Sequence, residues 1–179
     1  YTISFPMQDE FIPWDKIVIL NSDVTLQIPY FFGTPQNLSE SWPWENAAGP
    51  WQVGNVILRS QESLYYDNGD SILSTQWMES EIISITGGLN RIFVTVTHKF
   101  ETEWEHDPIV VSIRDINNNI LGHKSWTGNR WGDYETDYVT ATTDTGFNEV
   151  KVRLEFTPDQ TVNYRGWELQ DLTLYSWYD

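Results

Sequence analysis

The chain has 179 residues, of which 40% are hydrophobic and 15% aromatic, so it is long enough to bury one core and short for two domains. Lysine and arginine total 10 against 26 acidic residues, and the formal charge of −16 disfavours nucleic acid and anionic membrane surfaces as partners. The chain has no cysteine, which favours a bacterial or archaeal source, and no apolar run approaches the roughly 18 residues of a membrane span.

The first part of the chain contains short apolar runs separated by loops. Strands are expected in "DKIVIL", "VTLQIPYFF" and "WQVGNVILRS". The start "YTISFPMQDE" lacks the features of a signal peptide, so we expect a mature protein or an excised domain. Further on, residues 67–70 (Asp-Asn-Gly-Asp) are typical of a hairpin turn, and they also resemble part of an oxygen-rich calcium loop.

From residue 89 onward the chain alternates apolar and polar residues, which is the period of a strand with one buried face. The clearest case is "NEVKVRLEF", in which Val150, Val152, Leu154 and Phe156 share one face and are expected to line the core. Other strands are expected in "SEIISITGG", "RIFVTVTHKF", "PIVVSIRD" and "YETDYVTA", and "INNNILG" is expected to form a turn that tolerates positive φ. We therefore expect an all-β fold, an antiparallel two-sheet β-sandwich of the jelly-roll type, with residues 1–179 as a single domain.

The stretch "HKFETEWEHD" is rich in acids. If the preceding strand continues through it, Glu101, Glu103, Glu105 and Asp107 point the same way and repel one another unless they are solvated, protonated or neutralised by a cation. Three interpretations stay open: a solvated sheet face, a calcium site that uses one or two of these acids, and a glycosidase acid/base pair. The sequence contains no recognised enzyme motif, and its three histidines are interpreted as surface or satisfied core residues.

The stretch "RGWELQDLTLY", near the carboxyl end, places an aspartate among apolar residues. Leu169 and Leu172 fall out of phase in strict alternation, which predicts a kink or bulge near Gln170. A buried Asp171 costs several kcal/mol if it is left unpaired. Its carboxylate therefore needs either a cation or hydrogen-bond donors, such as backbone amides or Arg165.

Three stretches, "SLYYDNGDSILST", "RIFVTVTHKFETEWEHDPIVVSIRD" and "VKVRLEFTPDQTVNYRGWELQDLTLY", resemble the MAM-like jelly-roll domain of secreted bacterial peptidases of the immune inhibitor A type. The resemblance covers about residues 50–176. Its most specific part is the closing "G-W-x-I-D-D" strand, which is matched by Gly166, Trp167, Leu169 and Asp171. Gln170 stands where that strand has its first aspartate.

The resemblance implies a structural calcium ion between the early segment and the last strand. Asp171 is the expected ligand on the last strand, and Asp9 or Glu10 is its expected partner in the early segment. Asp107 is a further candidate ligand. The resemblance also implies a secreted or cell-surface protein that acts alone or packs on a neighbouring domain of the same polypeptide.

Aromatic residues gather in two loops that are rich in Gly, Pro, Asn and Ser. The candidates for sugar contact in these loops are Trp42, Trp44, Trp126, Asn129, Arg130, Trp131 and Tyr134. Exposed rings with polar neighbours suit sugar recognition, because a ring stacks on the C–H face of a pyranose while the neighbours bond its hydroxyls. The alternative is that these rings are lids over the ends of the sandwich or plugs in its core.

These observations lead to three functional hypotheses. The first is a non-catalytic, calcium-stabilised extracellular module that binds a polysaccharide or glycan. The second is an accessory or adhesion domain that packs on a neighbouring domain of a secreted peptidase. The third is a small glycan-active hydrolase that uses acids among Glu101, Glu103 and Asp107. Solvent-facing tryptophans favour a glycan, and rings in one contiguous apolar patch favour a protein neighbour.

Overall fold

The computed structural model describes residues 35–42, 44–49, 51–53, 58–60, 75–85, 89–158 and 164–177. Within these ranges the chain is almost wholly β, with one 3-10 turn, η1 (Ser39–Ser41), and no α-helix. This part of the chain also contains no helix that is long and apolar enough to cross a membrane. The strands expected before residue 34, the turn at residues 67–70, and the calcium candidates Asp9 and Glu10 lie outside the described residues.

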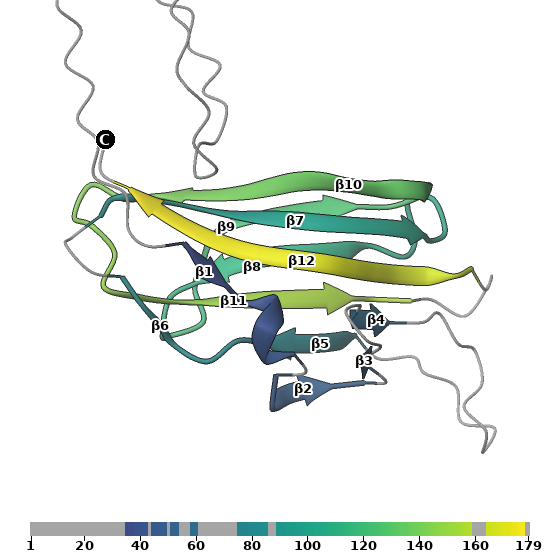
Figure 1. Cartoon of the computed structure of the whole chain (residues 1–179), viewed down its shortest axis with the longest axis horizontal. Helices are drawn as coiled ribbons and strands as arrows, with labels where there is room; N and C mark the ends of the chain where they lie inside the picture. Colours follow the sequence, from purple (N-terminus) through teal and green to yellow (C-terminus); the bar gives the residue numbers. More distant parts are fainter. Residues whose placement is uncertain are drawn as a thin grey trace, which may run out of the picture.

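The described strands form two six-stranded sheets, which we call sheet A and sheet B, with antiparallel pairing throughout (Figure 1). Sheet A has the order β10-β7-β12-β4-β3, with β1 paired to β12. Its strands are β1 (Gln36–Asn37), β3 (Gln52–Val53), β4 (Leu58–Ser60), β7 (Arg91–Glu101), β10 (Asn129–Thr142) and β12 (Gly166–Trp177). Sheet B has the order β2-β5-β11-β8-β9, with β6 paired to β11. Its strands are β2 (Asn46–Ala48), β5 (Gln76–Glu79), β6 (Ile83–Ser84), β8 (Ile109–Arg114), β9 (Ile120–Trp126) and β11 (Glu149–Phe156).

One hydrophobic core lies between the sheets, and alternation along the strands builds it. In β11, Val150, Val152, Leu154 and Phe156 are fully buried, and the residues between them are more exposed. In β7 the even-numbered residues from 92 to 100 are all buried. The predicted all-β two-sheet sandwich and the predicted core face of β11 are therefore confirmed.

The acidic stretch after β7 differs from its expected form. β7 ends at Glu101, and the chain enters a loop, residues 102–108, before β8 begins. Glu105 has a φ of +67°, which an extended strand excludes. Glu103 and Glu105 therefore belong to a loop, and Asp107 is fully buried within it. The expected row of acids on one strand face does not form.

β12 carries the bulge that the sequence predicts near Gln170. Its pairing with β7 shifts between Leu169 and Asp171, so Gln170 is an extra residue in the ladder. The bulge allows Leu169 and Leu172 to be fully buried together. Asp171 instead pairs with Thr97, on the outer face of sheet A. The aspartate therefore does not point into the core.

The edge strands of the two sheets, β9 and β10, close one side of the sandwich. Gly122 of β9 lies so near β10 that a Cβ atom on it would stand 2.0 Å from the carbonyl oxygen of Thr140. No side chain fits into that space, because the neighbouring atom belongs to the backbone and cannot rotate away. A glycine is required there for the two strands to approach.

Replacing Gly122 by alanine should push β9 away from β10 and destabilise the fold. Overpacking of this kind costs about 1–3 kcal/mol, so thermal unfolding should show a Tm several degrees below that of the wild type. Gly132→Ala is the matched control, because a Cβ at Gly132 meets no atom within 4 Å. Equal Tm values for the two variants would show that the strands do not approach at Gly122.

Candidate functional site

β10 departs from its neighbour β7 at one place, and this departure creates the candidate site. The pairing runs through Arg130 and resumes at Glu135, so the four residues 131–134 stand opposite Lys99 alone. We call these four residues, Trp-Gly-Asp-Tyr, the aromatic bulge. Lys99 points to the outer face of sheet A, because the residues before and after it in β7 are buried.

The two rings of the aromatic bulge lie against Lys99. Its Nζ atom is 4.8 Å from the ring centre of Trp131 and 4.7 Å from that of Tyr134. The same ammonium pairs with Glu168 of β12 at 3.1 Å, and the Tyr134 hydroxyl donates a hydrogen bond to this carboxylate at 3.0 Å. The Glu168 side chain is only 2% exposed. These cation–π and charge-assisted contacts hold both rings in place.

Polar side chains form a rim around Trp131. Arg165, just before β12, has its guanidinium carbon 5.4 Å from the ring centre and bonds Glu101 at 3.3 Å. Asn129 donates its side-chain amide to Glu101 at 3.1 Å and accepts the backbone N–H of Trp131 at 3.0 Å. Arg165 is 64% exposed, so it is the partner of Trp131 that a ligand displaces most readily.

The charges around the two rings are balanced in contacting pairs. Lys99 faces Glu168, and Arg165 faces Glu101. Asp133, which is exposed in the aromatic bulge, adds one further negative charge. Hydrogen-bond donors and acceptors thus surround aromatic rings without a strong positive field. This composition suits a flat, hydroxyl-bearing and uncharged ligand.

Two of the predicted sugar-contacting residues lie on the inner side of β10 and β9. Arg130 is directed inward by its register and bonds Asp137 at 2.6 Å. Trp126 packs against the core, with its ring centre 4.8 Å from that of His98. Lys124 also bonds Asp137, at 2.6 Å. The structure therefore separates Trp126 and Arg130 from the aromatic bulge.

This inner network holds a neutral histidine. His98 is fully buried, and its Nδ1 accepts the indole N–H of Trp167 at 3.0 Å, which places its proton on Nε2, 3.2 Å from Asp137. Burial lowers the pKa of His98 to about 4, and the hydrogen bond and charge of Asp137 oppose this only in part. Burial by itself would raise the pKa of Asp137, but bonds from Lys124, Arg130 and His98 hold it below its usual range.

The two candidates from the first aromatic loop lie against the core. Trp44 is 6% exposed and belongs to the core. Trp42 is half-buried against the same core, and its indole N–H has no hydrogen-bond partner among the described residues. Of all the aromatic candidates, the structure brings Trp131 and Tyr134 together, with Asn129 beside them.

The calcium candidates in the described residues lie apart. Asp171 is partly exposed on the outer face of sheet A, where Thr173 donates its hydroxyl at 3.0 Å and the Ser39 hydroxyl lies at 3.1 Å. Asp107 is buried in the loop that follows Glu101, whereas Asp171 pairs with Thr97, four residues before the end of β7. No group of three or more His, Cys, Asp or Glu side chains suited to a metal occurs among the described residues. The calcium ion expected at Asp171 stays a prediction.

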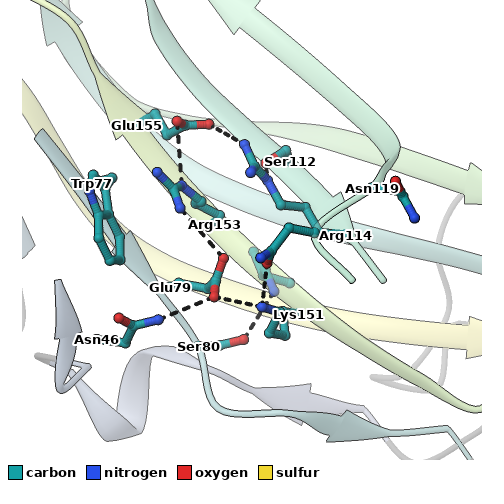
Figure 2. A network of polar contacts seen from close by, with 12 residues as sticks. Asn46, Trp77, Glu79, Ser80, Ser112, Arg114, Asn119, Lys151, Arg153 and Glu155 are labelled. Atoms are coloured by element: carbon teal, nitrogen blue, oxygen red, sulfur yellow. Dashed lines mark hydrogen bonds and ion pairs between the residues drawn. The ribbon is translucent and has the colours of Figure 1, made fainter. Parts of the chain in front are cut away.

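A second polar cluster lies on the outer face of sheet B (Figure 2). Glu79, only 4% exposed, bonds Lys151 at 2.8 Å. Arg114 bonds Glu155 at 2.6 Å. Arg153 joins the two carboxylates, at 3.4 Å from Glu155 and 3.8 Å from Glu79. These pairs connect β5, β11 and β8, so we interpret this cluster as a stabiliser of sheet B.

The sequence alone does not connect Lys99 and Glu168 with the aromatic residues. A signal is present, because alternation with buried neighbours places Lys99 and Glu168 on the outer faces of their strands. The two charges can pair only if β7 and β12 are neighbours, and a single sequence does not show this. Their role therefore becomes visible only in the folded sheet.

No protein-family profile matches the sequence, and no curated protein matches it. The solved structures similar to this chain include the C-terminal CBM6 of LamC, a marine laminarinase from Zobellia galactanivorans. The TM-score is 0.44 and the identity 13%, over 78% of this chain and 98% of that one. CsCBM6-3 from Clostridium stercorarium, in complex with cellobiose, has a TM-score of 0.46 and 13% identity. The match covers 80% of this chain and 94% of that one.

A third similar structure is the carbohydrate-binding module CBM6cm-2 from Cellvibrio mixtus lichenase 5A, in complex with cellotriose. Its TM-score is 0.44 and its identity 8%, over 78% of this chain and 94% of that one. Similarity at these scores and identities assigns neither a family nor a ligand to this chain. The resemblance to MAM-like domains stays a prediction.

Acid should destabilise the fold through His98. Above pH 6.5 the imidazole is neutral in the folded and the unfolded chain, so it does not lower the free energy of unfolding. Between pH 6.5 and about 4 the unfolded chain binds the proton first, and the free energy of unfolding should fall by about 3 kcal/mol. At lower pH the protonation of Asp137, whose folded pKa is depressed, adds a further loss. Urea denaturation at each pH measures both steps.

Two variants isolate the histidine in this experiment. His98→Gln should flatten the curve between pH 6.5 and 4, because the group that titrates is gone. His123→Gln removes an exposed histidine and should keep the wild-type fall. A free energy of unfolding that stays constant over this range in the wild type would show that His98 is not held neutral.

Proposed function

We propose that this protein is a non-catalytic module that binds a polysaccharide at the aromatic bulge, on the outer face of sheet A. The observation that carries the proposal is the pair of rings, Trp131 and Tyr134, fixed beside Lys99 and Glu168 and rimmed by hydrogen-bonding side chains. Structural polysaccharides lie outside cells, so we also propose that the protein is secreted or held at the cell surface.

Stacking is the main interaction in this proposal. An aromatic ring offers a flat apolar area, and a pyranose offers a C–H face that covers it. The Trp131 ring lies against the Lys99 ammonium, so it loses little further freedom when a sugar binds. Arg165 leaves the ring on binding, and its guanidinium then donates hydrogen bonds to sugar hydroxyls.

Charge favours an uncharged polysaccharide over an anionic one. The cations near the rings, Lys99 and Arg165, already have carboxylate partners. The chain as a whole carries −16, so a uronate-rich or sulfated polymer is repelled at long range. An anionic ligand therefore meets repulsion without gaining an unpaired cation.

The surroundings of the two rings support a glycan over a protein partner. Lys99 contacts both rings and Arg165 contacts Trp131, and charged neighbours of this kind suit a hydroxyl-bearing ligand better than an apolar protein surface. A hydrolase has less support, because Asp107 is fully buried and Glu101 is bonded by its neighbours. Packing on a peptidase domain has only the MAM-like resemblance in its favour.

Affinity electrophoresis against a panel of polysaccharides tests the proposal. The panel contains soluble cellulose, β-1,3-glucan, xylan, mannan, chitin and pectin. We expect at least one uncharged polymer to retard the wild type and pectin to leave it unretarded. Trp131→Ala should weaken the binding about fivefold or more, because the stacking surface is lost. Its Tm should change by only a few degrees, because Trp131 lies outside the core.

Tyr138→Ala is the matched control, because Tyr138 is a 64% exposed aromatic of β10 outside the aromatic bulge. It should bind as the wild type does. Three results contradict the proposal: full affinity in Trp131→Ala, loss of its folded state, or no retardation of the wild type by any polymer.

Calcium is a separate proposal that rests on the MAM-like resemblance, with Asp171 and either Asp9 or Glu10 as ligands. An ion that binds only the folded chain stabilises it by about 2.7 kcal/mol at a hundredfold excess over its dissociation constant. The Tm should therefore fall in EDTA and recover in calcium, and Asp171→Asn should remove the difference. Identical melting in calcium and in EDTA would reject calcium and leave the polysaccharide proposal standing.

A further inference from the structure

The loop between β7 and β8, residues 102–108, exposes a tryptophan. Trp104 is 68% exposed, which makes it the most exposed large hydrophobic side chain among the described residues. Burial of a tryptophan normally removes a large apolar area from water. The exposed Trp104 ring does not contribute this free energy to folding. A large exposed ring on a backbone that is held in one conformation indicates a contact surface.

Three hydrogen bonds fix this backbone. Thr102 donates its N–H to the carbonyl oxygen of Gly128 at 2.8 Å, and Gly128 donates its N–H to the Thr102 hydroxyl at 3.1 Å. Glu105 donates its N–H to the Thr127 hydroxyl at 3.3 Å. Glu105 also has a φ of +67°, a conformation that non-glycine residues rarely adopt. The loop is thus tied on both sides of Trp104 to the turn between β9 and β10.

Gly128 provides the support on which the indole rests. A Cβ atom built on Gly128 would lie 2.6 Å from Cε3 and 3.0 Å from Cζ3 of Trp104, so the ring lies directly against the glycine backbone. Gly128 has a φ of +94°, which also favours glycine. The part of the ring that does not touch Gly128 is open to solvent, and this accounts for its 68% exposure.

Trp104 lies at the same end of sheet A as the aromatic bulge. Gly128 directly precedes Asn129, the first residue of β10, which pairs with Glu101 and accepts the backbone N–H of Trp131. Gly128 and Trp131 are three residues apart, or about 10 Å along an extended chain. Asn129, which bonds Glu101, lies between Gly128 and Trp131 along the chain.

We propose that Trp104 is a second stacking residue of the polysaccharide-binding site and contacts a sugar unit further along the polymer than the unit on Trp131. The inference rests on the proposed function and extends it from one ring to a path along the end of β10. In this arrangement Asn129 and Glu101 bond hydroxyls of the intervening part of the polymer. A ring held in advance in one position binds at a lower entropic cost than a mobile one.

The length of the oligosaccharide distinguishes the two tryptophans. A disaccharide covers the aromatic bulge alone, whereas a hexasaccharide also reaches Trp104. The probes are the disaccharides and hexasaccharides of the cello-, laminari-, xylo-, manno- and chito-series, titrated calorimetrically into the wild type and the variants. Trp104→Ala should weaken hexasaccharide binding about fivefold and leave disaccharide binding within twofold of the wild type. Trp104→Tyr should restore most of the loss, because it keeps a ring that can stack.

The controls separate a binding role from a structural one. Trp131→Ala should weaken binding of both lengths, and Tyr138→Ala should weaken neither. Trp104→Ala should keep its Tm within about 2 °C of the wild type, as expected for an exposed side chain. A large fall in Tm, with equal weakening for both lengths, would make Trp104 a structural residue and overturn the inference.

The remaining outcomes distinguish this inference from the function on which it rests. Unchanged hexasaccharide affinity in Trp104→Ala, together with weakened binding in Trp131→Ala, overturns the role of Trp104 and leaves the proposed function intact. If the wild type binds no oligosaccharide of either length and no polymer, the proposed function and this inference fail together.

Discussion

The surfaces of sheet A depend on the pairing of β7 with the strands on its two sides. β12 has its extra residue, Gln170, near the partners of Thr97 and His98, and β10 inserts residues 131–134 opposite Lys99. β7 itself stays regular, so it determines which residues of its neighbours face the core. Bulges bend a strand and increase its local twist. Two of them at one level of β7 direct side chains from three strands toward the same region.

Beside these two bulges, adjacent residues of β7 make contacts on opposite faces of sheet A. Lys99 faces outward and joins Glu168 and the aromatic bulge, so its contacts span β7, β12 and β10. His98 faces inward and joins Asp137 and Trp167, which lie on the same two neighbouring strands. Each set buries charged or polar groups whose desolvation is offset only by good geometry. The rigidity of the candidate site and the stability of sheet A therefore have a common origin.

The sequence predicts the features that depend on a single strand. Alternation in β11 identifies its core-facing residues, since burial on one face leaves its mark at every second position. The change of phase between Leu169 and Leu172 indicates the bulge in β12. The Asn-rich turn after β8 does contain a residue with positive φ, Asn118 at +69°. In each case the cause lies within a few consecutive residues.

Features that depend on the pairing of two strands could not be predicted in this way. The sequence placed Trp126 and Trp131 in one sugar-binding loop, yet one ring packs inward and the other lies outside. Trp126 belongs to β9 of sheet B, opposite Ile109, whereas Trp131 follows Arg130 in β10 of sheet A, and this division is defined only by the pairing of the strands. The end of β7 at Glu101 has a similar cause, because two hydrogen bonds between Thr102 and Gly128, which is distant in sequence, hold the loop that follows.

The contact between Gly122 and Thr140 bears on how copies of this protein behave when they are crowded together. An edge strand offers unpaired backbone groups on which strands of another molecule can add, and this is a common route to aggregation. Here the edges of both sheets turn toward each other on one side, so that side gives an incoming strand little to pair with. A protein that collects along a polymer reaches a local concentration far above that in solution. Under the proposed function, the closed side of the sandwich allows many copies to bind side by side on one polymer without joining into a continuous sheet.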